Sequence, residues 1–376
     1  MPMTIPKIDR ATAFIDRRAI THNIKIAQSI SPSAKIMAVV KANGYGHGML
    51  NTANILSPFV HGYAVARHEE AQALRANGIR QEILVMSPTN NFKQLQDYPL
   101  NNFTVAVHTK EMLEFAMNMS NLSYWVKIDT GMHRLGIDKD ELSQHFLQEP
   151  LKNQPKVLMT HFSEAQKKHS IATQKQLHCF IEIFNSSNID AFSISNSAAI
   201  VINENKEAYR QWQSLTTTLS NSQEYLRPGL MIYGIDPLDT PNKASTELKP
   251  AMTLAAPIIS IRSIKAGDSV GYNSKWTAKR DSKIATVAIG YADGYPRHAK
   301  NGTPILVNGK RTALAGAVSM DSLCVDITDH QDEIILGDTA ILWGNDLPIN
   351  SIAKYADTIA YDLMTAIAER VAKAII

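Results

Sequence analysis

The chain has 376 residues, of which 44% are apolar and 19% are charged, so it is long enough for two domains and too apolar to be disordered. Its formal net charge is +3, which gives no case for nucleic acid as the main partner, because phosphate binding needs a clustered basic patch. It has two widely separated cysteines, no N-terminal signal segment and no run that could cross a bilayer, so we expect a cytoplasmic protein without a membrane partner.

Short apolar runs alternate with stretches of helical spacing from residue 35 onward. The runs that we expect to be buried strands are 35–42, 62–66, 82–86, 103–107, 124–129, 156–162, 191–195 and 230–234. Helices are expected at 67–79, with Glu70 on the solvent face, and at 110–119. This alternation predicts a parallel sheet, and we expect a TIM-like (β/α)8 barrel over 17–243. A doubly wound sheet with extra strands is the alternative.

The pattern of the chain changes after residue 243. Short β-rich pieces follow, separated by Asn-Gly, Asp-Gly and Gly-Asp turns, and the segment 307–310 (VNGK) is a strong hairpin signal. The polar, proline-containing stretch 236–250 carries the expected domain boundary. We therefore expect a mainly β domain over 244–376.

The segment 38–48, AVVKANGYGHG, places Lys41 at the end of the first predicted barrel strand. Barrel enzymes build their active sites from strand ends and the loops that follow them. A lysine in such a cleft loses solvation, which lowers its pKa, and the neutral amine is both a nucleophile toward a carbonyl and a general base. The glycines let the backbone pass close to a ligand, and Tyr45 offers a hydroxyl. The alternative is a lysine that extends to solvent above a glycine turn.

Polar side chains follow several other predicted strands. They are Lys127, Asp129 and Arg134, then His161, then Asn196 and Ser197, and finally Arg227 before a Pro-Gly turn. Each alone has a structural explanation, such as a satisfied histidine, a capping serine or a surface arginine. Because the strand ends of one barrel converge, the set together predicts a site for an anionic ligand with a carbonyl, such as pyridoxal phosphate.

The sequence resembles the alanine racemase family. The matching motifs, in the family's order, are AVVKANGYGHG, KIDTGMHRLG, NSAA, RPGLMIYG, GYADGYPR and VSMD, with similar segments at 14–24 and 358–371. The resemblance covers nearly the whole chain. It implies racemisation of L- and D-alanine with pyridoxal phosphate and without a metal. It also implies a head-to-tail homodimer with shared active sites, and a β domain that the N-terminal strand within 1–16 joins.

The resemblance also assigns roles to residues. Lys41 would hold the cofactor as a Schiff base and serve as one catalytic base, and the partner subunit's Tyr272 would be the second base. The other implied cofactor contacts are Tyr45, Ser197 and the amides of Gly229 and Leu230 at the phosphate, Arg227 at the pyridine nitrogen, and His161 beside Arg227. Arg134 and the partner subunit's Met320 would bind the substrate carboxylate. Lys127 matches a position that is often a carbamylated lysine.

Several features depart from the family pattern, and two of them bear on function. Ala317 stands where an arginine of the substrate entryway is usual, and the segment 200–226 is longer and more polar than expected. A racemase of the same fold with a broader substrate range is therefore one alternative. A non-catalytic pyridoxal phosphate carrier built as a lone barrel is another, and the second domain with Tyr272 argues against it.

Overall fold

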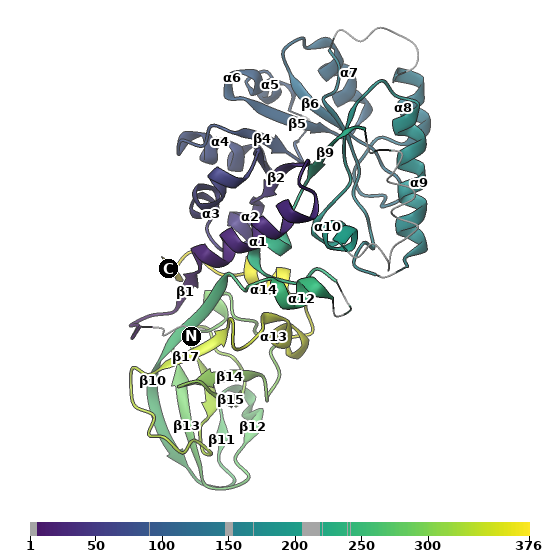
Figure 1. Ribbon diagram of the computed structural model, residues 1–376. Helices are drawn as coiled ribbons and strands as arrows, with labels where there is room; N and C mark the ends of the chain where they lie inside the picture. The colour runs from purple at the N-terminus through teal and green to yellow at the C-terminus, as the bar shows by residue number, and fades with distance from the viewer. Residues whose placement is uncertain are drawn as a thin grey trace. The chain divides into compact units, whose positions relative to one another are not determined.

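A computed structural model describes residues 6–89, 91–146, 153–167, 169–204, 219, 221–238, 240 and 242–376 (Figure 1). The chain divides into two compact units. The barrel unit comprises Ile20–Gly44 and Met49–Leu248, and the β unit comprises Met1–Ala19, Tyr45–Gly48 and Lys249–Ile376. Most of the predicted segment 200–226 lies outside the described residues.

In the described part of the barrel unit, eight parallel strands close into a barrel, which confirms the expected fold and excludes the doubly wound sheet. The strands, in barrel order, are β2 (Lys35–Val39), β3 (Gly62–Val65), β4 (Glu82–Val85), β5 (Phe103–Val107), β6 (Ser123–Lys127), β7 (Val157–Met159), β8 (Ala191–Ser193) and β9 (Gln223–Leu226). β9 pairs with both β8 and β2, so the ring has no free edge.

The expected eighth strand was misplaced. The run 230–234 forms the 3-10 helix η3 (Leu230–Tyr233), and the barrel is closed instead by β9. β9 begins with two polar residues, so it has no apolar run. Both can lie in the strand because their side chains are hydrogen-bonded: Glu224 accepts from the Ser195 hydroxyl at 2.9 Å, and Gln223 donates to the Ser33 carbonyl at 3.1 Å. The residues Leu230–Tyr233 are apolar and buried. A short apolar run has the same sequence pattern in a buried strand and in a buried helical turn.

Helices cover the outside of the barrel (Figure 1). Apart from α2 (Lys41–Tyr45), whose residues 42–44 are left-handed rather than helical, the helices and 3-10 turns between Arg17 and Glu247 are α1 (Arg17–Ile30), α3 (Met49–Leu56), η1 (Ser57–Phe59), α4 (His68–Ala76), α5 (Phe92–Leu95), α6 (Tyr98–Asn101), α7 (Lys110–Asn118), α8 (Lys139–Phe146), α9 (Ile171–Asn185), α10 (Ser197–Glu204) and α12 (Lys243–Glu247). The two predicted helices correspond to α4 and α7. Among the helices that the structure describes, none is both long and apolar enough to span a membrane.

The β unit is built mainly of strands, as expected, and these pair mostly in antiparallel orientation. The order of its main sheet is β13-β16-β15-β14-β17-β10-β1-β18, and β10 also pairs with β13. These strands are β1 (Thr12–Ile15), β10 (Met252–Ile264), β13 (Ser282–Val287), β14 (Pro304–Val307), β15 (Lys310–Leu314), β16 (Leu323–Asp326), β17 (Thr339–Trp343) and β18 (Ala372–Ile375). The smaller elements are β11 (Ser269–Val270), η4 (Tyr272–Ser274), β12 (Trp276–Thr277), η5 (Tyr291–Asp293), α13 (Ile349–Tyr355) and α14 (Ala360–Thr365).

The predicted hairpin is confirmed at β14 and β15. Asn308 and Gly309 have φ angles of 49° and 75°, and two positive values are what a tight two-residue connection between antiparallel strands requires. β1 pairs with β10 in antiparallel and with β18 in parallel orientation. The exact domain division at residues 243 and 244 stays a prediction.

Candidate active site

Lys41 begins a left-handed turn at the carboxyl end of β2. The φ angles of residues 42–46 are all positive, and three of them, Ala42 (52°), Asn43 (53°) and Tyr45 (51°), are not glycines. A left-handed conformation costs an L-residue roughly 1–2 kcal/mol, so the turn must be stabilised by its surroundings. Part of that support is local, because Gly44 N–H donates to the Val40 carbonyl at 2.9 Å and Met49 N–H donates to Asn43 Oδ1 at 2.9 Å.

Glu70 of α4 provides further support. Its Oε1 accepts a hydrogen bond from Ala42 N–H at 2.7 Å, and its Oε2 accepts from Ala66 N–H at 2.8 Å and from Arg67 N–H at 3.1 Å. One carboxylate therefore joins the ends of β2 and β3 beside Lys41. The sequence pattern placed Glu70 on the solvent face of its helix, where it is partly exposed, but it did not predict that its carboxylate binds these backbone groups.

Lys41 is partly buried, and that burial lowers its pKa. The positive charge of Arg134 lowers it further, and the negative charge of Glu70 acts in the opposite direction. The expectation of a desolvated strand-end lysine is thus met. A larger share of its amine is neutral at physiological pH than in a lysine exposed to water.

Lys127 occupies the last position of β6 and is only 7% exposed. Burial, and then the positive charges of Arg227, Arg134 and Lys41, lower its pKa to about 8. The positive charges of three other side chains, from different strand ends or loops, thus act on Lys127 at one end of the barrel. Such a cluster favours an anionic ligand.

Arg227 follows β9 and is buried, with 3% of its surface exposed. Its Nη1 donates to the Ser193 carbonyl at 2.8 Å and to the Ser193 hydroxyl, and its Nη2 donates to the Thr160 carbonyl at 2.7 Å. Burial lowers its pKa to about 10, which leaves it charged at neutral pH. Two neighbouring strand ends, those of β7 and β8, therefore fix the direction of a buried positive charge.

His161 follows β7. Burial, and then the charges of Arg227, Lys127 and the other two cations, hold its pKa well below the usual value. Its imidazole is therefore neutral at pH 7, and one ring nitrogen can accept a hydrogen bond. His161 contributes no fifth positive charge to the cluster.

Ser197 begins α10 and is buried. Its hydroxyl oxygen accepts hydrogen bonds from Gly229 N–H at 2.9 Å and from Met231 N–H at 3.3 Å. Gly229 directly precedes η3, which begins at Leu230. The start of η3 therefore lies beside Ser197 at the start of α10, and these are the residues expected to bind phosphate. Helix starts present backbone N–H groups to anions.

The loop that carries Arg134 is held by Asp129. Its Oδ1 accepts from the backbone N–H groups of Gly131, Met132 and His133 at 2.9, 3.1 and 3.0 Å, and its Oδ2 lies 3.3 Å from His133 Nδ1. Burial alone raises the pKa of Asp129, but these hydrogen bonds outweigh it and the pKa is lowered. Arg134 is exposed at the tip of this loop.

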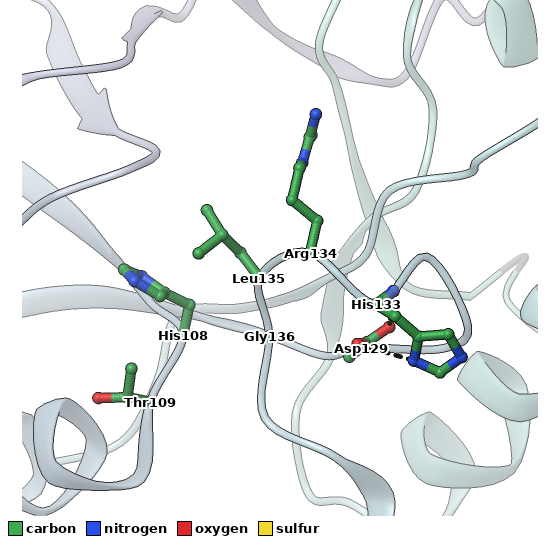
Figure 2. Close-up of a pocket in the computed structure, with 7 residues that line it drawn as sticks. All are labelled: His108, Thr109, Asp129, His133, Arg134, Leu135 and Gly136. Carbon is green, nitrogen blue, oxygen red and sulfur yellow. Dashed lines mark hydrogen bonds and ion pairs between the residues drawn. The ribbon is translucent and has the colours of Figure 1, made fainter.

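A pocket of about 410 Å³ lies beside this loop. Figure 2 shows its lining residues, which are His108, Thr109, Asp129, His133, Arg134, Leu135 and Gly136. Arg134 extends away from the Asp129–His133 pair (Figure 2). His108 and Thr109 were not predicted as site residues, although they follow β5 at the same end of the barrel.

The remaining predicted residues belong to the β unit. Tyr45 is buried against Tyr361, with ring centroids 6.1 Å apart, and burial raises the pKa of its hydroxyl. Tyr272 in η4 is 64% exposed and Met320 is 53% exposed. The Met320 carbonyl accepts from Ala292 N–H at 2.9 Å.

A closed parallel barrel with a partly buried lysine, two further buried cations and a buried serine beside backbone amides at one end is typical of a barrel enzyme for an anionic ligand. The family comparisons agree. Residues 15–237 match the model of the alanine racemase N-terminal domain, and residues 251–375 match that of the C-terminal domain.

Relatives extend this match to almost the full length. The alanine racemase of Photobacterium profundum is 40% identical over 373 residues, covering 96% of this chain and 98% of that protein. The biosynthetic alanine racemase of Pseudomonas aeruginosa is 35% identical, with a TM-score of 0.87 over 98% of this chain and 100% of that one. The Bartonella henselae alanine racemase, solved with covalently bound pyridoxal phosphate, is 27% identical, has the same TM-score and gives the same coverage. This chain therefore belongs to the alanine racemase family of isomerases, and the resemblance seen in the sequence is confirmed.

We expect Glu70→Ala to destabilise the Lys41 turn, because three backbone N–H groups lose a charged acceptor while the left-handed residues keep their intrinsic cost. The free energy of unfolding should fall by about 1–3 kcal/mol. Thermal unfolding measures this, with Glu69→Ala on the same helix as the matched control. Equal midpoints for the two variants would contradict the role given to Glu70.

Proposed function

We propose that this protein interconverts L-alanine and D-alanine with pyridoxal phosphate held covalently on Lys41. One observation supports this most strongly: Lys41 lies partly buried among Lys127, Arg134 and Arg227, with an anion cradle at the same end of the barrel. When bound, pyridoxal phosphate withdraws electrons from the alanine Cα and makes its proton acidic.

The residues present fit that cofactor. The Ser197 hydroxyl and the amides of Gly229 and Leu230 would bind the phosphate, with the Tyr45 hydroxyl as a further donor. Arg227 would donate to the pyridine nitrogen. An arginine side chain only donates and stays charged, so the nitrogen facing it must accept and remain unprotonated. The neutral His161 would pack beside Arg227 without adding charge.

Racemisation needs a base on each face of the alanine Cα. A single rigid base would return the proton mainly to the face from which it was taken. We assign one face to the Lys41 amine, whose lowered pKa increases the neutral fraction that can accept a proton. The other face is assigned to the hydroxyl of the partner subunit's Tyr272. The high exposure of Tyr272 on its own chain supports this assignment.

The substrate carboxylate would be bound by Arg134 and by the backbone amide of the partner subunit's Met320. We propose that Lys127 is carbamylated, which would place a negative charge beside Arg134. A lysine with a pKa of about 8 has a substantial neutral fraction near neutral pH, and only the neutral amine reacts with carbon dioxide. The head-to-tail homodimer and the cytoplasmic location also stay proposals.

A broader substrate range is the second candidate, and Ala317 favours it. The Ala317 backbone nitrogen lies 3.6 Å from the position that a Cβ on Gly271 would take, so this small residue borders the turn that carries Tyr272. Chiral product analysis with a panel of L-amino acids separates the two candidates. The lone-barrel carrier is disfavoured, since the chain has a second compact unit that matches the family's C-terminal domain.

Borohydride reduction of the cofactor-loaded protein should fix pyridoxal phosphate on Lys41. Lys41→Ala should lose this adduct, and racemisation of alanine should fall at least roughly a thousandfold because both the anchor and one base are removed. Lys35→Ala, at the opposite end of the same strand, is the control and should keep the adduct. Peptide mapping that finds the adduct on another lysine would refute the assignment.

Mixing two inactive variants tests the shared site. Lys41→Ala and Tyr272→Phe dimers should each be nearly inactive. After random subunit exchange, half of the dimers are mixed, and each has one intact site, so roughly a quarter of the wild-type activity should return. If Tyr272 served its own chain, every site would carry one lesion. Continued inactivity after exchange has been verified by mass-tagged subunits would exclude an intersubunit site.

A further inference from the structure

Gln176 is a buried amide on α9, with only 2% of its surface exposed. Its Oε1 accepts hydrogen bonds from Ser163 N–H at 2.9 Å and from the Ser163 hydroxyl at 3.0 Å. Its Nε2 donates to the His161 carbonyl at 3.1 Å. One side chain therefore fixes the backbone on both sides of Phe162, in the loop that carries His161.

The same amide reaches the loop that carries Arg134. Gln176 Nε2 lies 3.5 Å from Thr130 Oγ1, and Gln176 Cγ would lie 3.5 Å from a Cβ built on Gly131. Thr130 and Asp129 together start this loop. Asp129 binds the loop's own backbone, whereas Gln176 ties its first residues to a rigid helix.

The network continues to the buried arginine. Thr130 Oγ1 and Thr160 Oγ1 are 2.8 Å apart, and Thr160 Oγ1 donates to the Ile128 carbonyl at 3.0 Å. The Thr160 carbonyl accepts from Arg227 Nη2 at 2.7 Å. A continuous set of buried polar groups thus runs from α9 behind the barrel to Arg227.

We propose that Gln176 is a positioning residue that holds the His161 loop and the Arg134 loop in register for substrate binding. The inference rests on the proposed function, in which Arg134 binds the substrate carboxylate. Gln176 acts through other residues, since its amide is occupied by the two loops. Removing it would leave the Ser163 N–H and the His161 carbonyl without their partner, so the loops would move to satisfy them.

Gln176→Leu is the direct test, and Gln174→Leu on the same helix is the matched control. The probe is propionate, which has the carboxylate of alanine but no amine to react. Its equilibrium dissociation constant for the cofactor-loaded protein should rise about tenfold in Gln176→Leu and stay within about twofold in the control. The KM for alanine should rise more than kcat falls. An unchanged dissociation constant in Gln176→Leu would overturn the proposal.

Thr130→Val provides a second route if Gln176→Leu does not fold. It removes the hydroxyl between Gln176 and Thr160 and keeps the side-chain volume, so propionate binding should weaken by a smaller factor. Where all the variants fold, the variant that combines Gln176→Leu with Thr130→Val should lose less propionate affinity than the product of the two single factors, because both substitutions act on one network. A Thr130→Val protein that binds propionate like the wild type would overturn the proposal. Failure of the wild type to racemise alanine would refute the proposed function instead, so the two failures are distinguishable.

Discussion

The burial of positive charges beside one another at the carboxyl end of the barrel is the constraint on which the rest of the site depends. Lys127 and Arg227 are almost fully buried, and the charges of Lys41 and Arg134 act on the same space. Burying like charges together is costly unless one of them loses its proton or an anion joins them. Either response serves a racemase, because a neutral lysine can accept a proton and an anionic cofactor or substrate is drawn to the cluster.

Two carboxylates and one amide hold this cluster in place. Glu70 supports the left-handed turn after Lys41, Asp129 folds the Arg134 loop onto itself, and Gln176 fastens that loop and the His161 loop to α9. None of the three needs to contact the substrate. Their hydrogen bonds fix the backbone that carries the like-charged side chains, which would otherwise repel one another.

Much of this was predictable from sequence. Apolar runs at the right spacing predicted seven of the barrel strands, and polar residues at their ends pointed to Lys41, Lys127 and His161. Arg227 was singled out by the Pro-Gly turn that follows it, although the strand before it was missed. The eighth strand was missed because Gln223 and Glu224 are satisfied by hydrogen bonds and leave no apolar run. Glu70 and Gln176 were also missed, since a polar residue on a helix has the same sequence pattern whether it faces water or binds a loop. Only the three-dimensional contacts distinguish the two.

The state of the Lys127 amine tests the account most directly. The pKa of the unmodified amine is about 8. At a pH below this value the amine is mainly protonated, and at a higher pH it is mainly neutral. NMR of the active enzyme in isotopically labelled bicarbonate, recorded on both sides of that value, should show a carbamate carbon that Lys127→Met lacks and that grows as the pH rises through this range. A fully active enzyme whose Lys127 stays a free amine throughout, with the pKa of an exposed lysine, would contradict the claim that the burial of like charges organises this site.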